Sequence, residues 1–334
     1  MAGSLADVAR RAGVSIATAS RALSGSSHPV SAKVRERIMR AAQELGYSPS
    51  ALARALVTRR SRIIGLILGD IVDVYFAEIT RGVEDVARRS GYLTIVCDAD
   101  RDPAAELAYL RLLGDYQSEG VIFTGGGALD DPAAATLADQ VRRASEAGVR
   151  VVSLAPRAFG GATVTIDNRA AAAEITRQLV SLGHRRIAFV AGMPEITTSA
   201  LRLEGFRAAM AEAGLDAGEV YAGNFRFEAG QAAADEMVRR GLPEAVLAAN
   251  DESAIGVVMA LRDAGVKVPE DVSVAGIGNT RTSRFVDLTT VSVELNELGA
   301  IAARRIIDPE GWDPALRISV PHRVIIRSTT RERR

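Results

Sequence analysis

The sequence contains little sulfur and little imidazole. One cysteine, Cys97, and three histidines, His28, His184 and His322, occur among 334 residues. A single cysteine excludes a disulfide within the chain and a cluster of thiolate metal ligands. No histidine has a serine, cysteine or metal-ligand companion at a spacing suited to catalysis. The sequence therefore argues against an enzyme and predicts no catalytic residue and no metal site.

Long apolar runs are also missing. No run approaches the ~18 residues that a membrane-spanning helix needs, and the first residues do not join a basic stretch to an apolar one, as a secretory signal does. We therefore expect a cytoplasmic protein with no membrane partner. With 48% apolar residues, a chain of this length can bury more than one core, so two or three domains are expected.

The net charge of zero hides an asymmetry along the chain. Residues 1–62 contain eleven Lys and Arg against three Asp and Glu, whereas the remainder contains thirty against thirty-eight. A basic head joined to an acidic body indicates a polyanionic partner for the head. The alternative is a solvated basic face with no partner.

The first 48 residues predict a small all-α domain. Apolar residues recur at helical spacing at Leu5, Val8, Ala9 and Ala12. Gly13 tolerates a tight turn, and Ser15 is a natural N-cap for a second helix that ends near Leu23. A third helix is expected between Ser31 and Gly46. Two short helices around a glycine turn are typical of a helix-turn-helix.

Two stretches, 5–15 and 47–56, resemble signature sequences of the lac repressor family, and the similarity continues along the whole chain. This resemblance implies a ligand-responsive transcriptional repressor that binds an operator in double-stranded DNA as a homodimer and senses a small, sugar-like effector. It also implies that residues 49–61 form a hinge helix and linker between the head and a core at 62–334.

The second helix should lie in the major groove, which is wide enough for one helix. The resemblance places base-reading positions at Ile16, Ala17 and Arg21. Arg21 could bind guanine in a bidentate manner or contact only a phosphate, whereas Ile16 and Ala17 offer apolar contact, for instance to a thymine methyl. Contacts to the DNA backbone are expected from Ser15, Ser20 and the loop that contains His28.

The segment 50–56, which follows Pro49, is too short to be a stable isolated helix. In the resembled family it folds when two copies meet in the minor groove, and a leucine there enters between base steps. Leu56 occupies that leucine's place, and Arg54 is predicted to contact DNA as well. The alternative is a flexible linker with Leu56 packed on the core.

From residue 62 onward, short β-branched runs alternate with amphipathic helical stretches, which indicates an α/β fold with parallel sheets. Two such series predict two doubly wound lobes, and the whole resembles the periplasmic sugar-binding fold. We expect the chain to cross between the lobes near Thr163, Val291 and Ser319. The expected N-lobe comprises residues 62–162 and 292–318, and the expected C-lobe 163–291 and 319–330.

Ligands of such sheets lie beyond the carboxyl ends of the strands, so we expect the site in the cleft between the lobes. Tyr75, Phe76 and Phe225 could stack on a ligand or belong to the core. The resemblance suggests that Asp251 accepts ligand hydroxyls and that Arg202 forks onto ligand oxygens or a carboxylate, although Asp251 could equally cap the following helix. Weaker candidates are Thr198 and Arg157.

One motif departs from the resembled family. Many relatives have an acid after the strand that ends near Ile277, but here the sequence reads Gly276-Ile277-Gly278-Asn279. A ligand recognised through that acid would lose its partner, so no particular sugar or purine is carried over. The run of glycines at 125–127 has the wrong spacing for a dinucleotide-binding fingerprint, and no cofactor is expected.

Affinity for operator DNA should fall steeply with salt, because each phosphate contact of the basic head releases counterions. We expect the logarithm of the affinity to fall linearly with the logarithm of salt concentration, with a slope of about −0.9 per phosphate contact. Titration of the full chain on DNA between low and physiological salt measures this slope. An affinity that does not change with salt would contradict the electrostatic interpretation of the head.

Overall fold

The computed structural model describes residues 3–24, 30–47, 60–127, 132–216 and 218–333. The chain forms two compact units, Met1–Ile63 and Ile64–Arg334. The first contains the predicted head and hinge, and the second contains the predicted core. Three residues that are predicted to contact DNA, His28, Arg54 and Leu56, lie outside the described residues.

The head contains the three helices that the sequence predicts: α1 (Leu5–Ala12), α2 (Ile16–Ser24) and α3 (Ala32–Glu44). Ser4 and Asp7 form a capping box at the start of α1, and Gly13 ends this helix at a left-handed φ of 62°. The Ser15 hydroxyl accepts a hydrogen bond from the Thr18 N–H at 3.1 Å, so Ser15 caps α2 as predicted. Buried residues of all three helices, including Val8, Ala19 and Ile38, form one small core.

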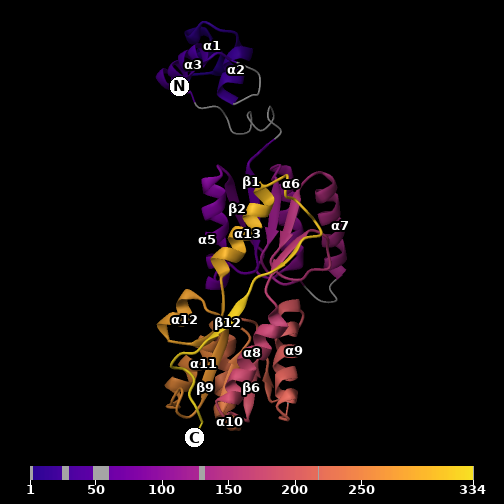
Figure 1. Ribbon diagram of the computed structural model, residues 1–334, viewed down its shortest axis with the longest axis vertical. Helices are drawn as coiled ribbons and strands as arrows, with labels where there is room; N and C mark the ends of the chain where they lie inside the picture. The colour runs from indigo at the N-terminus through magenta and orange to yellow at the C-terminus, as the bar shows by residue number, and fades with distance from the viewer. Residues whose placement is uncertain (1–2, 25–29, 48–59, 128–131, 217, 334) are drawn as a thin grey trace. The chain divides into compact units, whose positions relative to one another are not determined.

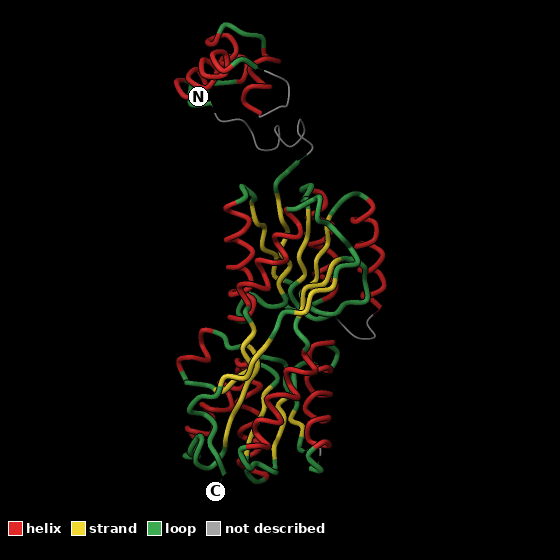
Figure 2. The backbone as a smooth tube through the Cα atoms, in the orientation of Figure 1, coloured by secondary structure: helices red, strands yellow, loops and turns green. Residues whose placement is uncertain are grey.

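The second unit consists of two α/β lobes (Figures 1 and 2). The N-lobe sheet has the strand order β11-β5-β4-β3-β1-β2. Its strands are β1 (Ile63–Leu68), β2 (Leu93–Asp98), β3 (Gly120–Phe123), β4 (Arg150–Ser153), β5 (Ala162–Thr165) and β11 (Arg317–Ser319). Its helices are α5 (Val74–Arg89), α6 (Pro103–Asp115), α7 (Pro132–Glu146) and α13 (Leu295–Ile307).

The C-lobe sheet has the order β12-β10-β9-β8-β6-β7, in which only the β10–β12 pair is antiparallel among the described pairs. Its strands are β6 (Ile187–Val190), β7 (Val220–Tyr221), β8 (Ala245–Ala248), β9 (Ser273–Gly278), β10 (Thr289–Val293) and β12 (His322–Ile325). Its helices are α8 (Asn168–Ser181), α9 (Thr197–Glu212), α10 (Phe227–Arg240), α11 (Asp251–Asp263) and α12 (Arg281–Phe285).

The chain passes between the lobes three times, after β5, after β10 and after β11. The first two crossings lie slightly later than predicted. Thr163 pairs with Arg317 inside the N-lobe sheet, so the chain leaves that lobe only after Thr165. Val291 pairs with Ile277 inside the C-lobe sheet, and β10 continues to Val293. Strand pairing beyond the predicted positions therefore sets the lobe boundaries.

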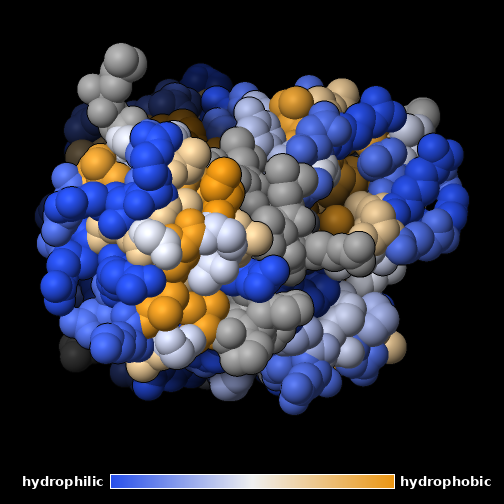
Figure 3. All heavy atoms as spheres, turned by 90° about the horizontal axis from the view of Figure 1, so that it is seen from above, coloured by the Kyte–Doolittle hydropathy of each residue, from blue (hydrophilic) through white to orange (hydrophobic). Residues whose placement is uncertain are grey.

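Hydrophilic side chains cover most of the face drawn in Figure 3, with smaller hydrophobic patches between them. Among the described residues, no helix is both long and apolar enough to span a membrane. The edge strand β2 is one place where apolar side chains reach the surface, and Leu93 is 61% exposed there. Cys97 on the same strand is only half-buried. An edge strand has a neighbour on one side only, which explains the exposure.

Helices α5 and α13 lie side by side on the N-lobe sheet (Figure 1), and glycines allow their backbones to touch. A Cβ atom on Gly82 of α5 would lie 1.9 Å from the Asn296 carbonyl oxygen of α13. A Cβ atom on Gly299 of α13 would lie 2.2 Å from the Ile79 carbonyl oxygen of α5. Neither backbone can shift unless its whole helix moves. The close contacts at Gly82 and Gly299 therefore fix α13 against the N-lobe, immediately after the second crossing.

Replacement of Gly82 by Ala should lower the free energy of unfolding of the core by about 1–3 kcal/mol, because the added methyl group overpacks a backbone contact. Gly114 of α6 provides the control, since its Cβ would meet nothing within 4 Å. Gly114→Ala should raise the stability by about 0.5–1 kcal/mol, as alanine does inside a helix. Urea denaturation of the two variants measures both effects, and equal stabilities would contradict the close packing of α5 on α13.

Candidate functional site

One face of α2 in the head is free of packing within its own unit. Ile16, Ala17 and Arg21 are exposed and Ser20 is half-buried, whereas Ala19 and Ala22 are buried in the head's core. The four outward residues are spaced i, i+1, i+4 and i+5, which places them on one side of a helix. Ile16 is the large apolar side chain on this face and is 55% exposed. Contact of this face with DNA bases stays a prediction.

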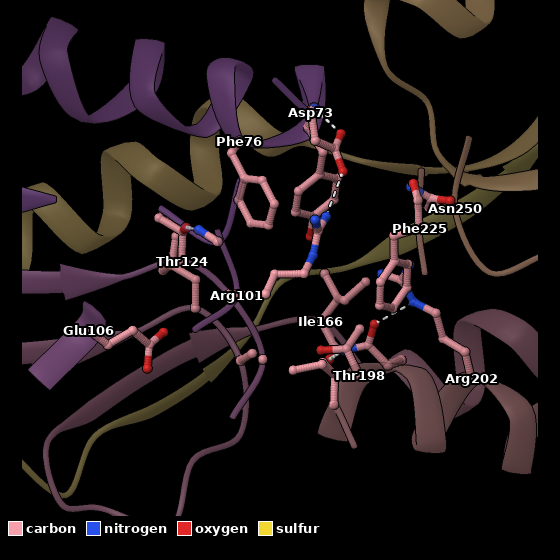
Figure 4. Close-up of a pocket in the computed structure, with 18 of the residues that line it drawn as sticks. Asp73, Phe76, Arg101, Glu106, Thr124, Ile166, Thr198, Arg202, Phe225 and Asn250 are labelled. Atoms are coloured by element: carbon pink, nitrogen blue, oxygen red, sulfur yellow. Dashed lines mark hydrogen bonds and ion pairs between the residues drawn. The ribbon is translucent and has the colours of Figure 1, made fainter. Parts of the chain in front are cut away.

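The core contains a cavity of about 70 Å³ at the carboxyl ends of strands from both lobes (Figure 4). A cavity needs roughly 10–15 Å³ to hold one water molecule, so this one has room for a compact ligand group. Residues from the N-lobe and its loops line one side, including Asp73, Phe76 and Arg101. Residues from the C-lobe line the other, including Arg202, Phe225 and Asn250.

Five of the residues that the sequence predicts to bind ligand line this cavity, namely Tyr75, Phe76, Thr198, Arg202 and Phe225. Tyr75 and Phe76 come from the first turn of α5 in one lobe, and Phe225 comes from the segment before α10 in the other. Phe76 and Phe225 are each 7% exposed, so both also belong to the hydrophobic cores of their lobes. A position in the core and a position at the cavity are therefore compatible for these aromatic residues, while their contact with a ligand stays a prediction.

Arg202 on α9 is 3% exposed and held by neutral groups. Its Nε donates a hydrogen bond to Asn168 Oδ1 at 2.9 Å, and its Nη1 donates to the Ala249 carbonyl oxygen at 2.5 Å. Burial lowers the pKa of Arg202, and its electrostatic interactions with Tyr75, Asp251 and Asp73 partly offset that effect. In the part of the chain that the structure describes, no carboxylate oxygen lies within ion-pair distance of Arg202.

A second arginine in the cavity wall, Arg101, was missed at the sequence level. Its guanidinium forms ion pairs with Asp70 at 2.5 Å and Asp73 at 3.4 Å. The guanidinium carbon also lies 5.8 Å from the ring centroid of Phe76 and 5.6 Å from that of Phe225, so it joins the lobes through cation–π contacts. Burial raises the pKa of Asp73 to about 6. The sequence signal that could have identified Arg101 is the charged run 98–102 at the end of a strand.

Asp251 is not among the residues that line the cavity, and its contact with ligand hydroxyls stays a prediction. Its carboxylate is 1% exposed and accepts hydrogen bonds from the Thr280 N–H at 2.7 Å and the Thr290 hydroxyl at 2.5 Å. Burial raises the pKa of Asp251, and these hydrogen bonds act against the rise. Gly276 and Gly278 leave the space that Asp251 fills, since a Cβ on Gly276 would lie 2.7 Å from Asp251 Oδ1.

The alternative N-cap role for Asp251 was wrong, because the cap of α11 is the preceding residue, Asn250. Asn250 Oδ1 accepts a hydrogen bond from the Ser253 N–H at 3.1 Å, and Asn250 Nδ2 donates one to the Phe225 carbonyl oxygen at 2.7 Å. Asn250 lines the cavity. The sequence analysis therefore chose the wrong member of an adjacent pair.

Arg157 lies outside the cavity lining as well. It forms a buried bidentate ion pair with Glu106, with nitrogen–oxygen distances of 2.6 and 2.7 Å, and donates to the Gly125 carbonyl oxygen. Its guanidinium also lies against the rings of Phe123 and Phe159. Because Glu106 and Gly125 do line the cavity, Arg157 supports the wall from behind rather than facing a ligand.

Contacts between the lobes hold the cavity closed on several sides. The Gly127 carbonyl oxygen accepts hydrogen bonds from both the N–H and the hydroxyl of Thr197, each at 2.9 Å. On another side, Arg226 of the C-lobe pairs with Asp70 at 3.4 Å and with Asp100. Glu78 accepts a hydrogen bond from the Arg281 N–H at 2.6 Å. The described arrangement of the core is therefore a closed one.

Comparisons with known proteins agree with this geometry. Residues 4–50 match the bacterial regulatory proteins of the lacI family, and residues 176–330 match a periplasmic binding protein-like domain. Catabolite control protein A of Priestia megaterium is 31% identical over 334 residues, which cover 97% of this chain and 98% of that protein.

Two solved structures extend the similarity. A lac repressor dimer bound to operator and the anti-inducer ONPF is 26% identical, with a TM-score of 0.87 over 99% of this chain and 100% of that one. A complex of the transcriptional regulator CelR with cellobiose is 29% identical, with a TM-score of 0.69 over 98% and 99% of the two chains. The fold and these matches define a DNA-binding transcriptional regulator rather than an enzyme. The chain belongs to the lacI family of bacterial regulatory proteins.

Replacement of Asp251 by Asn should destabilise the core, because an amide group would direct N–H toward buried donors that now meet a carboxylate. We expect a loss of about 1–3 kcal/mol in the free energy of unfolding, typical of an unsatisfied buried polar group. Asp263→Asn, at the exposed end of the same helix, is the matched control and should change stability little. Unfolding by urea measures both variants. Unchanged stability of the Asp251 variant would show that its hydrogen bonds do not hold α11 in place.

Proposed function

We propose that a small, sugar-like effector binds in the cavity between the lobes and thereby controls repression by a homodimer on operator DNA. The observation that carries this proposal is the composition of the cavity wall. Phe76 and Arg101 come from one lobe, and Arg202, Phe225 and Asn250 come from the other. A ligand that contacts both sets at once binds the closed arrangement better than an open one, and such a difference in affinity is what shifts a conformational equilibrium.

The chemistry of the wall supports a sugar-sized ligand. Three aromatic side chains, those of Tyr75, Phe76 and Phe225, line the cavity. Polar groups come from the buried Asn250 and Arg202 and from the half-buried Thr198. Compact sites of this kind combine apolar contact with a few well-placed polar groups that fix orientation. The similarity to the cellobiose complex of CelR supports the same class of ligand.

Homodimeric operator binding is supported by the similarity to the lac repressor dimer on operator and by the exposed face of α2. Two such helices would read half-sites about one DNA turn apart, or a multiple of that distance. The predicted hinge, with Arg54 and Leu56, would respond to the separation of the two cores. A transition between order and disorder in such a segment is an established way in which a ligand-driven conformational change is passed on.

Selection of binding sites from random duplexes with the full chain tests the proposal. We expect enrichment of a pseudo-palindrome whose affinity changes on addition of at least one member of a panel of neutral and acidic sugars. Enrichment of unpaired half-sites would contradict the homodimer. A panel that leaves both operator affinity and melting temperature unchanged would contradict the sugar-like effector.

Gly126→Ala should weaken effector binding without removal of any polar contact to the effector. A Cβ on Gly126 would lie 2.8 Å from both Ile196 Cγ2 and Thr198 Oγ1 across the lobe contact, so the closed arrangement is penalised. An overpacking cost of about 1–3 kcal/mol corresponds to a loss of roughly 5- to 150-fold in affinity.

Gly160→Ala is the control, because its Cβ would meet nothing within 4 Å. Calorimetric titration of both variants, with any sugar that shifts operator affinity of the unmodified protein, measures the difference. Equal affinities would show that closure at Gly126 is not coupled to binding.

A further inference from the structure

Carboxylates from both lobes face one another at the lobe contact. A second cavity of about 160 Å³ lies there, and it shares Asp73 and Phe225 with the ligand cavity. Asp70 and Asp73 line this second cavity from the segment between β1 and α5 of the N-lobe. Glu228 and Glu252 line it from the first turns of α10 and α11 of the C-lobe. The four negative charges therefore approach one another only when the lobes are together.

Two arginines neutralise only part of this charge. Arg101 lies 2.5 Å from Asp70 and 3.4 Å from Asp73, so its closer partner is Asp70. Arg226 pairs with the same Asp70 at 3.4 Å and with Asp100. The side chains of Arg226 and Asp100 are 46% and 64% exposed, and exposed ion pairs contribute little. Both arginines thus serve Asp70, while Asp73 has one distant cationic partner.

Glu252 of the C-lobe has no cationic partner among the described residues. It is half-buried, and neither a hydrogen bond nor an ion pair links it to another described residue. Burial raises the pKa of Glu252, and the negative charges of Asp73, Glu228, Asp251 and Asp70 raise it further. Since Asp70 and Asp73 belong to the other lobe, their part of this rise exists only while the lobes are together.

Asp73 of the N-lobe is in a similar position, because the C-lobe helps to cover it. Phe225 of the C-lobe borders both cavities that Asp73 lines, and Figure 4 shows Asp73 paired with Arg101 at the wall. Burial raises the pKa of Asp73 to about 6, although the hydrogen bond from the Tyr75 N–H and the charge of Arg101 act against the rise. Two negative charges add to it, those of Asp70 and Asp251.

Separation of the lobes would return both carboxyl groups to water, where their pKa is roughly 4. A group whose pKa is higher in the closed core than in an open one binds protons on closure, so a falling pH favours the closed core. With a pKa of about 6 in the closed core, Asp73 alone favours closure about fourfold more at pH ~5.5 than at pH ~7.5. Glu252 acts in the same direction, since its pKa is also raised in the closed core.

We propose that closure of the two lobes is linked to proton uptake, with Asp73 and Glu252 as the groups that bind the protons. Protonation of Asp73 leaves Arg101 with its closer partner Asp70 and with the rings of Phe76 and Phe225, so the lobe contact persists. The link goes beyond the proposed function, because it operates in the core before any ligand binds.

Hydrogen exchange of the full chain without ligand tests the proposal. The Thr197 N–H donates to the Gly127 carbonyl oxygen across the lobe contact at 2.9 Å, and neither group titrates. Its protection factor, corrected for the intrinsic exchange rate at each pH, therefore follows the closing equilibrium. We expect this factor to rise about fourfold or more between pH ~7.5 and pH ~5.5. Amides of β8, inside the C-lobe sheet, report opening of the whole core and should not rise in parallel.

Neutral variants identify the groups that bind the protons. Glu252→Gln removes a charge at nearly constant size, so it should raise the protection of the Thr197 amide at pH ~7.5 and reduce its pH dependence. Asp73→Asn keeps an N-cap oxygen for the Tyr75 N–H and should also reduce the pH dependence. The double variant should lose most of it. Glu270→Gln makes the same change at an exposed position between α11 and β9 and should retain it in full.

Each contrary result has a definite meaning. Protection of the Thr197 amide that stays constant or falls on acidification in the unmodified protein would overturn the proposal. A parallel change in the β8 amides would do the same, because it would report the stability of the whole core. If the double variant keeps the full pH dependence, other groups bind the protons, such as His184 behind Arg331 or His322 beside Glu174, and the proposal fails.

Discussion

Arg101 joins the two lobes of the core, and the shape of the cavity depends on that contact. Its guanidinium lies between the rings of Phe76 and Phe225 while Asp70 and Asp73 neutralise it. The loops that present these groups are strained, since Asp100, Arg101 and Phe225 have φ values of 46°, 60° and 69°, which non-glycine residues rarely adopt. Such strain persists only where the surrounding contacts over-determine it. The closed core therefore stores strain at the lobe contact that borders the ligand cavity.

The sequence was sufficient to predict the layout because the relevant signals are local. Glycine and serine positions bounded the helices of the head, and alternation of β-branched runs with amphipathic stretches predicted two α/β lobes. The rule that ligands lie beyond the carboxyl ends of strands then placed Tyr75, Phe76, Thr198, Arg202 and Phe225 at one cavity. The ends of β5 and β10 were less accurate, because pairing with β11 and β9 extends them and such pairing is not local.

The direction in which each charged side chain points could not be predicted, because it depends on partners far away in sequence. Arg157 turns toward Glu106, which is 51 positions away, and Asp251 turns toward Thr290, which is 39 positions away. Asn250, the N-cap of α11, lines the cavity, whereas the carboxylate of Asp251 in the first turn of that helix is bound by Thr280 and Thr290. A match to a family position identifies which residue is present, but it does not identify the hydrogen-bond and ion-pair partners of its side chain.

The glycines at positions 276 and 278 decide where the carboxylate of Asp251 lies in the C-lobe. Without side chains at positions 276 and 278, the carboxylate of Asp251 fits beneath β9 and is bound by Thr280 and Thr290. The carboxylate is thereby directed toward these threonines, while Arg202 is held at the cavity wall by Asn168 Oδ1 and the Ala249 carbonyl oxygen. Since burial of a cation costs free energy unless its donors are hydrogen-bonded, these two neutral acceptors are what keep the guanidinium in place.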